Sequence, residues 1–131
     1  MIRLFALASE VAPLVTGQWR YNRLAETRSD IRHANEAVLN DDTQPGRQIV
    51  FRPCWETPGR IQIRGSLPES MSREKITVSE QRPARAVAGD INRRLLPGFL
   101  QEWRETETRR QARDLRRGQQ WKLSIVSLRE H

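Results

Sequence analysis

The sequence predicts an α+β fold in which an antiparallel β-meander of three to five strands packs against an N-terminal helix and a long, kinked, basic C-terminal helix. Three observations lead to this prediction. Apolar residues recur at helical spacing near the N-terminus, two alternating segments in the middle are joined by a tight turn, and helical spacing returns after residue 83. A chain of 131 residues is expected to form a single domain, residues 1–131.

The N-terminal helix is expected within residues 2–15, whose apolar positions fit one helix face: Leu4, Leu7, Ala8, Val11 and Val15. Pro13 and Gly17 should end this helix early. Residues 19–24 then suit a strand, although their alternation is imperfect.

The polar segment from Ala25 to Asp42 allows two interpretations. It can form a helix with Ile31, Ala34, Val38 and Leu39 on one side, or it can form a long loop. Helix is the preferred prediction. The residues from Asn40 to Gly46, which include Pro45, then predict a break in regular structure.

A β-hairpin formed by residues 47–55 and 60–65 is the clearest local pattern. Pro58 and Gly59 suit the two central positions of a type II turn, because proline fixes a negative φ and glycine accepts a positive one. The alternating pattern puts four residues on one buried face: Ile49, Phe51, Ile61 and Ile63. Residues 75–79 should add a third strand, with Ile76 and Val78 on the same face.

A helix is expected to begin at Pro83, since the missing N–H of proline needs no partner in a first helical turn. It carries an apolar stripe that should cover the sheet: Ala84, Val87, Ala88, Ile91 and Leu95. Pro97 and Gly98 should kink or break the helix, after which a second stripe follows with Phe99, Leu100 and Trp103.

Residues 104–118 contain only two apolar side chains, Ala112 and Leu115, and are predicted to form a solvent-exposed basic helical extension. Glu105–Arg109 and Glu107–Arg110 would form charge pairs along it. Residues 121–128 fit a strand through Trp121, Leu123 and Ile125, and they fit a helix equally well.

The chain is strongly basic, with a net charge of +7, and arginine accounts for 21 of its 23 basic residues. A high arginine content can simply reflect the codon usage of a GC-rich genome. It is also the side chain that binds phosphates with two parallel hydrogen bonds and stacks on aromatic rings. We give the second explanation more weight where the arginines cluster.

The strongest candidate binding residues lie in the C-terminal helix. Five arginines occur within nine residues and are opposed only by Asp114: Arg109, Arg110, Arg113, Arg116 and Arg117. On a helix most of them share one side, so they would form a positive stripe that can follow a phosphate backbone. Arg104, beside Trp103, completes the candidate set.

Catalysis and cofactor binding are not expected. One cysteine and two histidines leave no spacing that could hold zinc, and no metal or other cofactor is predicted. Cys54 is expected to be a small core residue, and the four tryptophans are expected to be packing anchors. The one carboxylate–imidazole pair, Asp30 with His33 near Glu36, is typical of surface contacts, so the protein is predicted not to be an enzyme.

No segment has the composition of a signal peptide or of a membrane span, because Glu10 interrupts the only N-terminal apolar stretch. The sequence therefore predicts a soluble cytoplasmic protein with no membrane partner.

The segment from Ile76 to Ser79, followed by Arg82-Pro83 and the residues from Ala88 to Pro97, resembles short uncharacterised proteins carried by phages and plasmids. In those proteins a strand ending in Thr-Val-Ser leads into a helix with the pattern Asp-Ile-x-Arg-Arg-Leu-Leu-Pro. The resemblance covers about a sixth of the chain and implies an accessory protein of a mobile genetic element.

These observations predict a non-enzymatic binding protein of a mobile element that engages nucleic acid or a nucleoprotein through its arginine-rich helix. The alternative is a phage- or plasmid-encoded inhibitor of a host defence complex, comparable to an anti-CRISPR, that acts by protein–protein contact. The partner and the oligomeric state are left open by the sequence.

Overall fold

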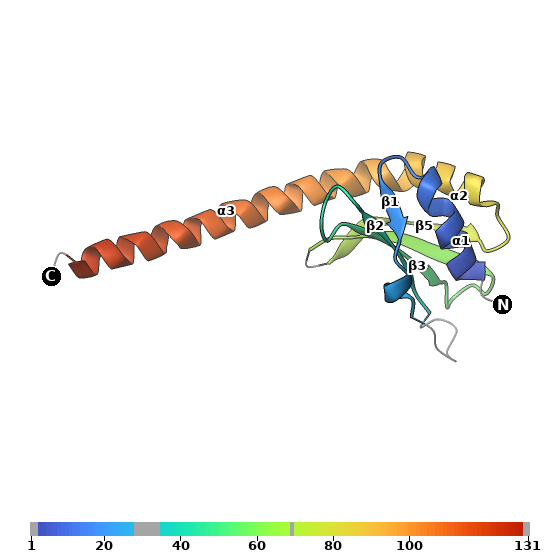
Figure 1. The fold of residues 1–131 in the computed structure, drawn as a ribbon, viewed down its shortest axis with the longest axis horizontal. Helices are drawn as coiled ribbons and strands as arrows, with labels where there is room; N and C mark the ends of the chain where they lie inside the picture. Colours follow the sequence, from blue (N-terminus) through green and yellow to red (C-terminus); the bar gives the residue numbers. More distant parts are fainter. Residues whose placement is uncertain (1–2, 28–34, 69, 130–131) are drawn as a thin grey trace.

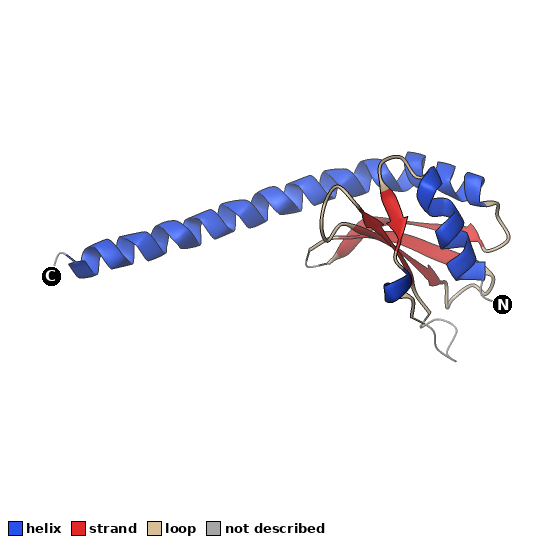
Figure 2. Cartoon of the chain, viewed as in Figure 1, coloured by secondary structure: helices blue, strands red, loops and turns tan. Residues whose placement is uncertain are grey.

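A five-stranded antiparallel sheet with helices along one of its faces makes up the globular part of the protein (Figures 1 and 2). The computed structural model describes residues 3–27, 35–68 and 70–129, of which residues 119–129 are described by their backbone alone. The predicted α+β fold, with an N-terminal helix, an antiparallel meander and a long C-terminal helix, is confirmed.

The elements follow one another as α1 (Arg3–Val11), β1 (Trp19–Tyr21), β2 (Ala37–Asp41), β3 (Gln48–Pro53), β4 (Arg60–Ser66), β5 (Met71–Ser79), α2 (Ala84–Asp90) and α3 (Leu96–Arg129). Short 3-10 turns follow α1 and β1, at Ala12–Leu14 and Arg23–Ala25. The strands lie in sequence order in the sheet, so each connection joins neighbouring strands.

Alternation along the strands separates the two faces of the sheet. In β4 every second residue is buried, and Ile61 and Ile63 join the core that α1, α2 and the start of α3 cover. Ile49, Phe51, Ile76 and Val78 lie on this same inner face, as the sequence predicted. We call the opposite side of the sheet the outer face.

The predicted hairpin is formed by β3 and β4. Gly59 has a φ of +83°, the conformation that the type II turn needs, and the Arg60 N–H donates to the Thr57 carbonyl at 3.3 Å. The predicted third strand is also present, and it begins four residues earlier than expected, at Met71.

The helix preferred for residues 25–42 is wrong where the structure describes this segment. Residues 37–41 form β2, which pairs with β1 and β3, and residues 28–34 lie outside the described residues. Val38 and Leu39 are both buried, but they lie on opposite faces of the sheet, and only Leu39 belongs to the main core. Adjacent apolar residues on a strand buried on both faces resemble a helical stripe, which explains the error. The strand predicted for residues 19–24 is shorter and ends at Tyr21.

The chain passes from α2 into α3 through a π-helical segment, Ile91–Leu95. The Leu96 N–H donates to the Ile91 carbonyl, five residues back, which places Pro97 just after a widened turn. Proline disrupts a regular helix because it lacks an N–H and its ring crowds the carbonyl four residues earlier. The π segment accommodates it, so the chain stays helical through Pro97 and Gly98 and the helix is not broken there. Residues 121–128, which fitted a strand or a helix, belong to α3.

Phe99 fixes the position of α3 on the sheet. This side chain is fully buried, and its ring lies directly over the backbone of β4 at Gly65, where a Cβ would overlap it. One turn further on, the buried Trp103 packs near the turn between β2 and β3, 3.9 Å from where a Cβ would lie on Gly46. α3 therefore crosses the inner face of β4 at one defined place.

Replacing Gly65 with Ala should lower the free energy of unfolding by about 1–3 kcal/mol, because the new methyl group forces the Phe99 ring to move in a packed core. Urea unfolding measures this change. Gly89→Ala is the matched control, since nothing lies within 4 Å of its added Cβ in α2; it should be neutral or stabilising by up to about 1 kcal/mol. Equal stability of the two variants would contradict the Phe99–Gly65 contact.

Candidate nucleic-acid interface

α3 extends well beyond the sheet as a single helix (Figure 1). It contains 34 residues and is therefore about 51 Å long. From Arg104 to Gly118, all side chains are exposed or half-buried, and Leu115 is 67% exposed. This part of the helix has the solvent-exposed character that the sequence predicted for residues 104–118.

The structure brings five of the six candidate arginines to one side of α3. At about 100° of rotation per residue, Arg109, Arg110, Arg113, Arg116 and Arg117 fall within an arc of about 120°. Arg104 lies at least about 120° outside that arc, on another side of the helix. We call the side defined by the five residues the arginine face; Arg104 does not belong to it.

The arginine face continues the side of α3 that packs on the sheet. Arg110 follows Trp103 by seven residues, so the two positions differ by only about 20° around the helix. The same side is apolar while it covers β4 and becomes basic where the sheet ends. Arg110, Arg113 and Arg117 consequently project on the sheet side of the helix axis, whereas Arg109 and Arg116 lie about 120° and 140° from Trp103 around the helix.

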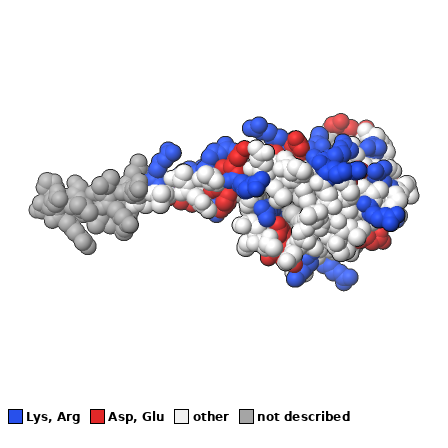
Figure 3. Space-filling model, turned by 90° about the horizontal axis from the view of Figure 1, so that it is seen from above, with Lys and Arg blue, Asp and Glu red and all other residues white. Residues whose placement is uncertain are grey.

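The contacts of Arg109 and Arg110 with the acidic residues of this region are weak. Arg110 reaches the Glu107 carboxylate at 4.0 Å, and Arg109 donates through Nε to the carbonyl oxygen of Glu105, at 3.4 Å, in place of the predicted contact with its carboxylate. Figure 3 shows basic and acidic side chains next to each other where α3 leaves the globular part. Exposed pairs of this kind are worth about 0–1 kcal/mol, so they leave Arg109 and Arg110 available to a stronger anion.

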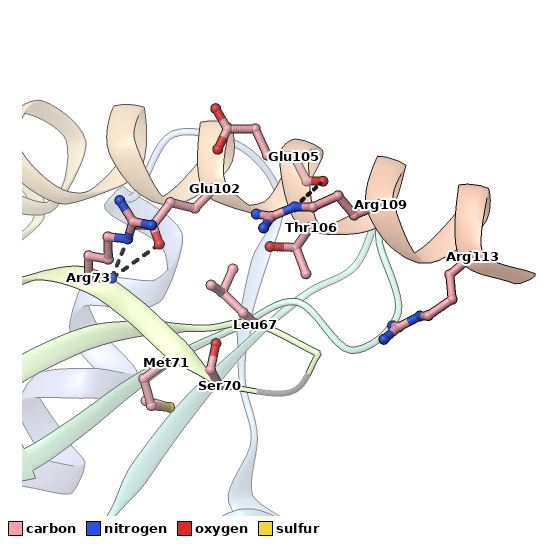
Figure 4. Close-up of a pocket in the computed structure, with 9 residues that line it drawn as sticks. All are labelled: Leu67, Ser70, Met71, Arg73, Glu102, Glu105, Thr106, Arg109 and Arg113. Carbon is pink, nitrogen blue, oxygen red and sulfur yellow. Dashed lines mark hydrogen bonds between the residues drawn. The ribbon is translucent and has the colours of Figure 1, made fainter.

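A cleft of about 440 Å³ lies where the arginine face begins (Figure 4). Leu67 and Ser70 from the connection between β4 and β5, with Met71 at the start of β5, form one wall. The other wall is formed by residues of α3: Glu102, Glu105, Thr106, Arg109 and Arg113. The Arg73 backbone N–H donates to both oxygens of Glu102, at 3.1 and 3.2 Å, and ties the helix to β5. The cleft is lined by both acidic and basic residues, so it is not a purely cationic pocket. It lies at the end of the arginine face that is nearest to the sheet.

Asp41 and Arg47 form a pair that contacts α3 at Trp103, and we call this pair the brace. The Nε of Arg47 donates to the Asp41 carboxylate at 2.8 Å, and its guanidinium lies 5.6 Å from the centre of the Trp103 ring. Asp41 also accepts from the backbone N–H and the hydroxyl of Thr43, at 2.8 and 2.6 Å. Burial raises the pKa of Asp41, but these hydrogen bonds and the charge of Arg47 outweigh burial and hold its pKa below the ordinary value.

Sequence reasoning missed this brace. Asp41 was assigned to a break, whereas it ends β2 and holds the following turn closed. The spacing Asp41-x-Thr43 is typical of a side chain that accepts from the backbone two residues on, and this was the available signal.

The tryptophans and the cysteine divide between expected and unexpected positions. Trp19 and Trp103 are buried packing residues, as predicted. Trp55 is 74% exposed, so its assignment as a packing anchor is wrong, and Cys54 is half-buried and lies outside the core. Both follow the end of β3, in the turn where the sheet no longer covers side chains.

In the part of the chain that the structure describes, the carboxylate–imidazole candidate does not come together as a catalytic site. Asp30 and His33 lie outside the described residues, and Glu36 is paired with Arg52 at 2.6 Å. Among the described residues, no three side chains of His, Cys, Asp and Glu come together as metal ligands could. Within the same ranges, no helix combines the length and the apolar character needed to cross a membrane.

Comparisons with protein-family models, with curated proteins and with solved structures found no match to this chain. The resemblance of residues 76–97 to phage- and plasmid-borne proteins therefore stays a prediction from the sequence.

The brace predicts a pH dependence. A carboxyl whose pKa is lower in the folded state contributes stability above its unfolded pKa, and this contribution is lost as the pH falls through the folded value. Asp41→Asn should therefore cost about 1–3 kcal/mol near pH 7, and the difference from the unchanged protein should shrink as the pH falls below about 4. Urea unfolding at several pH values measures both effects.

Asp42→Asn serves as the control, because Asp42 is exposed and its ion pair within the described part of the chain is with the exposed Arg20, at 3.2 Å. Its effect should stay below about 1 kcal/mol. A loss in Asp41→Asn that persists unchanged into acid would show that its charge is not what stabilises the turn.

Proposed function

We propose that this protein is a non-enzymatic nucleic-acid-binding protein that contacts the phosphate backbone through the arginine face of α3. The observation that supports the proposal is the alignment of five arginines on one side of an exposed helix, with ion pairing limited to long or backbone contacts for Arg109 and Arg110. The mobile-element setting is part of the proposal and comes from the sequence resemblance alone.

The chemistry of this face favours phosphate. Arginine keeps its charge at all physiological pH values, and its planar fork matches two phosphate oxygens at once. A row of such side chains neutralises successive phosphates and releases their counterions, which makes binding strong at low salt. Contacts to phosphate carry no sequence information, so this face alone would bind nucleic acid without strong sequence preference.

The same exposed helix could dock on a protein, as the defence-inhibitor alternative requires. Nucleic acid is the better match because Ala112 and Leu115 are the only apolar side chains between residues 104 and 118. Stable protein interfaces are centred on buried apolar or aromatic residues, and this stretch offers cations in their place.

The proposal predicts a salt-dependent affinity for duplex DNA or RNA that depends on the arginine face. Replacing Arg109, Arg113 and Arg116 with Gln should weaken binding at low salt and flatten the slope of log K against log salt by about 2.7, or about 0.9 for each lost contact. Fluorescence anisotropy with a labelled duplex of random sequence, titrated at several salt concentrations, measures both quantities.

The matched control replaces Arg23, Arg85 and Arg94, which are exposed and lie on other elements, with Gln. It changes the net charge by the same amount and should flatten the slope by well under one unit. If both triple variants lower the affinity equally, the protein's overall charge and not the arginine face attracts nucleic acid, and the proposal fails.

A further inference from the structure

The outer face of the sheet is basic and has a different make-up from the arginine face. Because side chains alternate along a strand, the partners of the buried core residues point to this side. Its middle row runs across the sheet in register as Val38, Val50, Arg64 and Lys75. The neighbouring row contains Arg52, Gln62 and Thr77, and Glu36 forms an ion pair with Arg52 at its end.

Three cations of this face lie next to each other across β3, β4 and β5. Arg64 on β4 is directly opposite Lys75 on β5, and Arg52 is the diagonal neighbour of Arg64 on β3. Like charges directly opposite each other on paired strands are destabilising. None of the acidic residues in β3, β4 and β5 has its side chain on this face. Glu74 of β5 lies on the inner face against α3: a Cβ added to Gly98 would be 2.7 Å from its carboxylate. Glu36 neutralises Arg52, which leaves the Arg64–Lys75 pair unbalanced.

Arg64 also has an unsatisfied donor. Its Nε is buried and has no hydrogen-bond partner among the described residues. Buried polar groups are nearly always hydrogen-bonded, and those of a charged group especially so. Arg64 as a whole is half-buried, so an anion that reaches the exposed part of its guanidinium would offset the repulsion with Lys75.

Trp55 lies just beyond the end of β3, in the turn before Arg60, and is 74% exposed. The Arg60 guanidinium donates to the Thr77 carbonyl on β5 at 2.9 Å, which holds it at this end of the sheet. This contact is to a backbone oxygen and does not neutralise the charge of Arg60. An exposed indole at the end of a sheet that also carries cations is a combination on which unpaired bases can stack while their phosphates are neutralised.

We propose that the outer face binds single-stranded nucleic acid, with phosphates at Arg64 and Lys75 and a base stacked on Trp55. The inference rests on the proposed function, since it concerns the same class of partner, but it uses a surface that the arginine face does not include. A duplex is a poorer match, because its bases are stacked on each other and have no free face to offer to Trp55.

The test is a titration with labelled oligothymidylate of about 10 nucleotides, within the span that small single-strand-binding domains cover. Trp55→Ala should weaken binding of this probe about tenfold or more, and Trp55→Phe should restore most of the affinity. Arg64→Gln combined with Lys75→Gln should flatten the salt slope by about 1.4, at about 0.7 for each contact to a single strand.

Two controls separate binding from folding. Removal of the like-charge pair should leave the thermal unfolding midpoint unchanged or raise it, so a loss of binding in that double variant does not reflect unfolding. Arg85→Gln combined with Arg94→Gln makes the same change in net charge on exposed residues of other elements and should leave the salt slope nearly unchanged.

The outcomes distinguish this proposal from the proposed function. Loss of oligothymidylate binding in the Trp55 and Arg64/Lys75 variants, with duplex binding retained, supports the outer face as a separate site. Oligothymidylate binding that is unchanged in both variants overturns the outer-face proposal, whatever the arginine-face variant does to the duplex. Equal effects of the Arg64/Lys75 and Arg85/Arg94 variants also overturn it, because they assign the affinity to net charge.

Discussion

The ring of Phe99, buried against the backbone of β4 at Gly65, determines how the rest of the molecule is arranged. Only a glycine lets a helix carry an aromatic ring this close to a strand. With Phe99 in place, Trp103 reaches the turn between β2 and β3, where Arg47 lies beside its ring and Asp41 holds Arg47. The direction in which α3 leaves the sheet follows from these few contacts, and so does the direction in which its arginines project.

The change from an apolar to a basic side within one helix has an energetic consequence. The first turns of α3 are stabilised by core burial, whereas the stretch beyond Trp103 depends on helix propensity and on weak surface pairs. An anion that neutralises the arginine face would reduce the repulsion between neighbouring cations on that stretch. Binding and helix stability are therefore expected to reinforce each other.

The two basic surfaces differ in kind. The arginine face is a row of exposed cations on a convex helix, suited to a continuous phosphate backbone. The outer face combines cations with Gln62, with the buried Val50 and with an exposed indole at its edge, which suits contacts to both phosphates and bases. Trp55 and the turn that Trp103 contacts lie at opposite ends of the β3–β4 hairpin, since Trp55 follows β3 and that turn precedes it.

Local chemistry by itself determined much of this fold. Pro58 and Gly59 specified the hairpin turn, alternating isoleucines specified the inner face, and the loss of apolar residues after Trp103 specified an exposed basic helix. These features depend on neighbours in the chain, so the sequence displays them directly. The tertiary structure decided the rest: that Val38 and Leu39 belong to a strand, that Trp55 is exposed, and that Arg64 faces Lys75. Each of these depends on strand pairing and on which face the helices cover, and such contacts join residues far apart in the chain, where no local pattern records them.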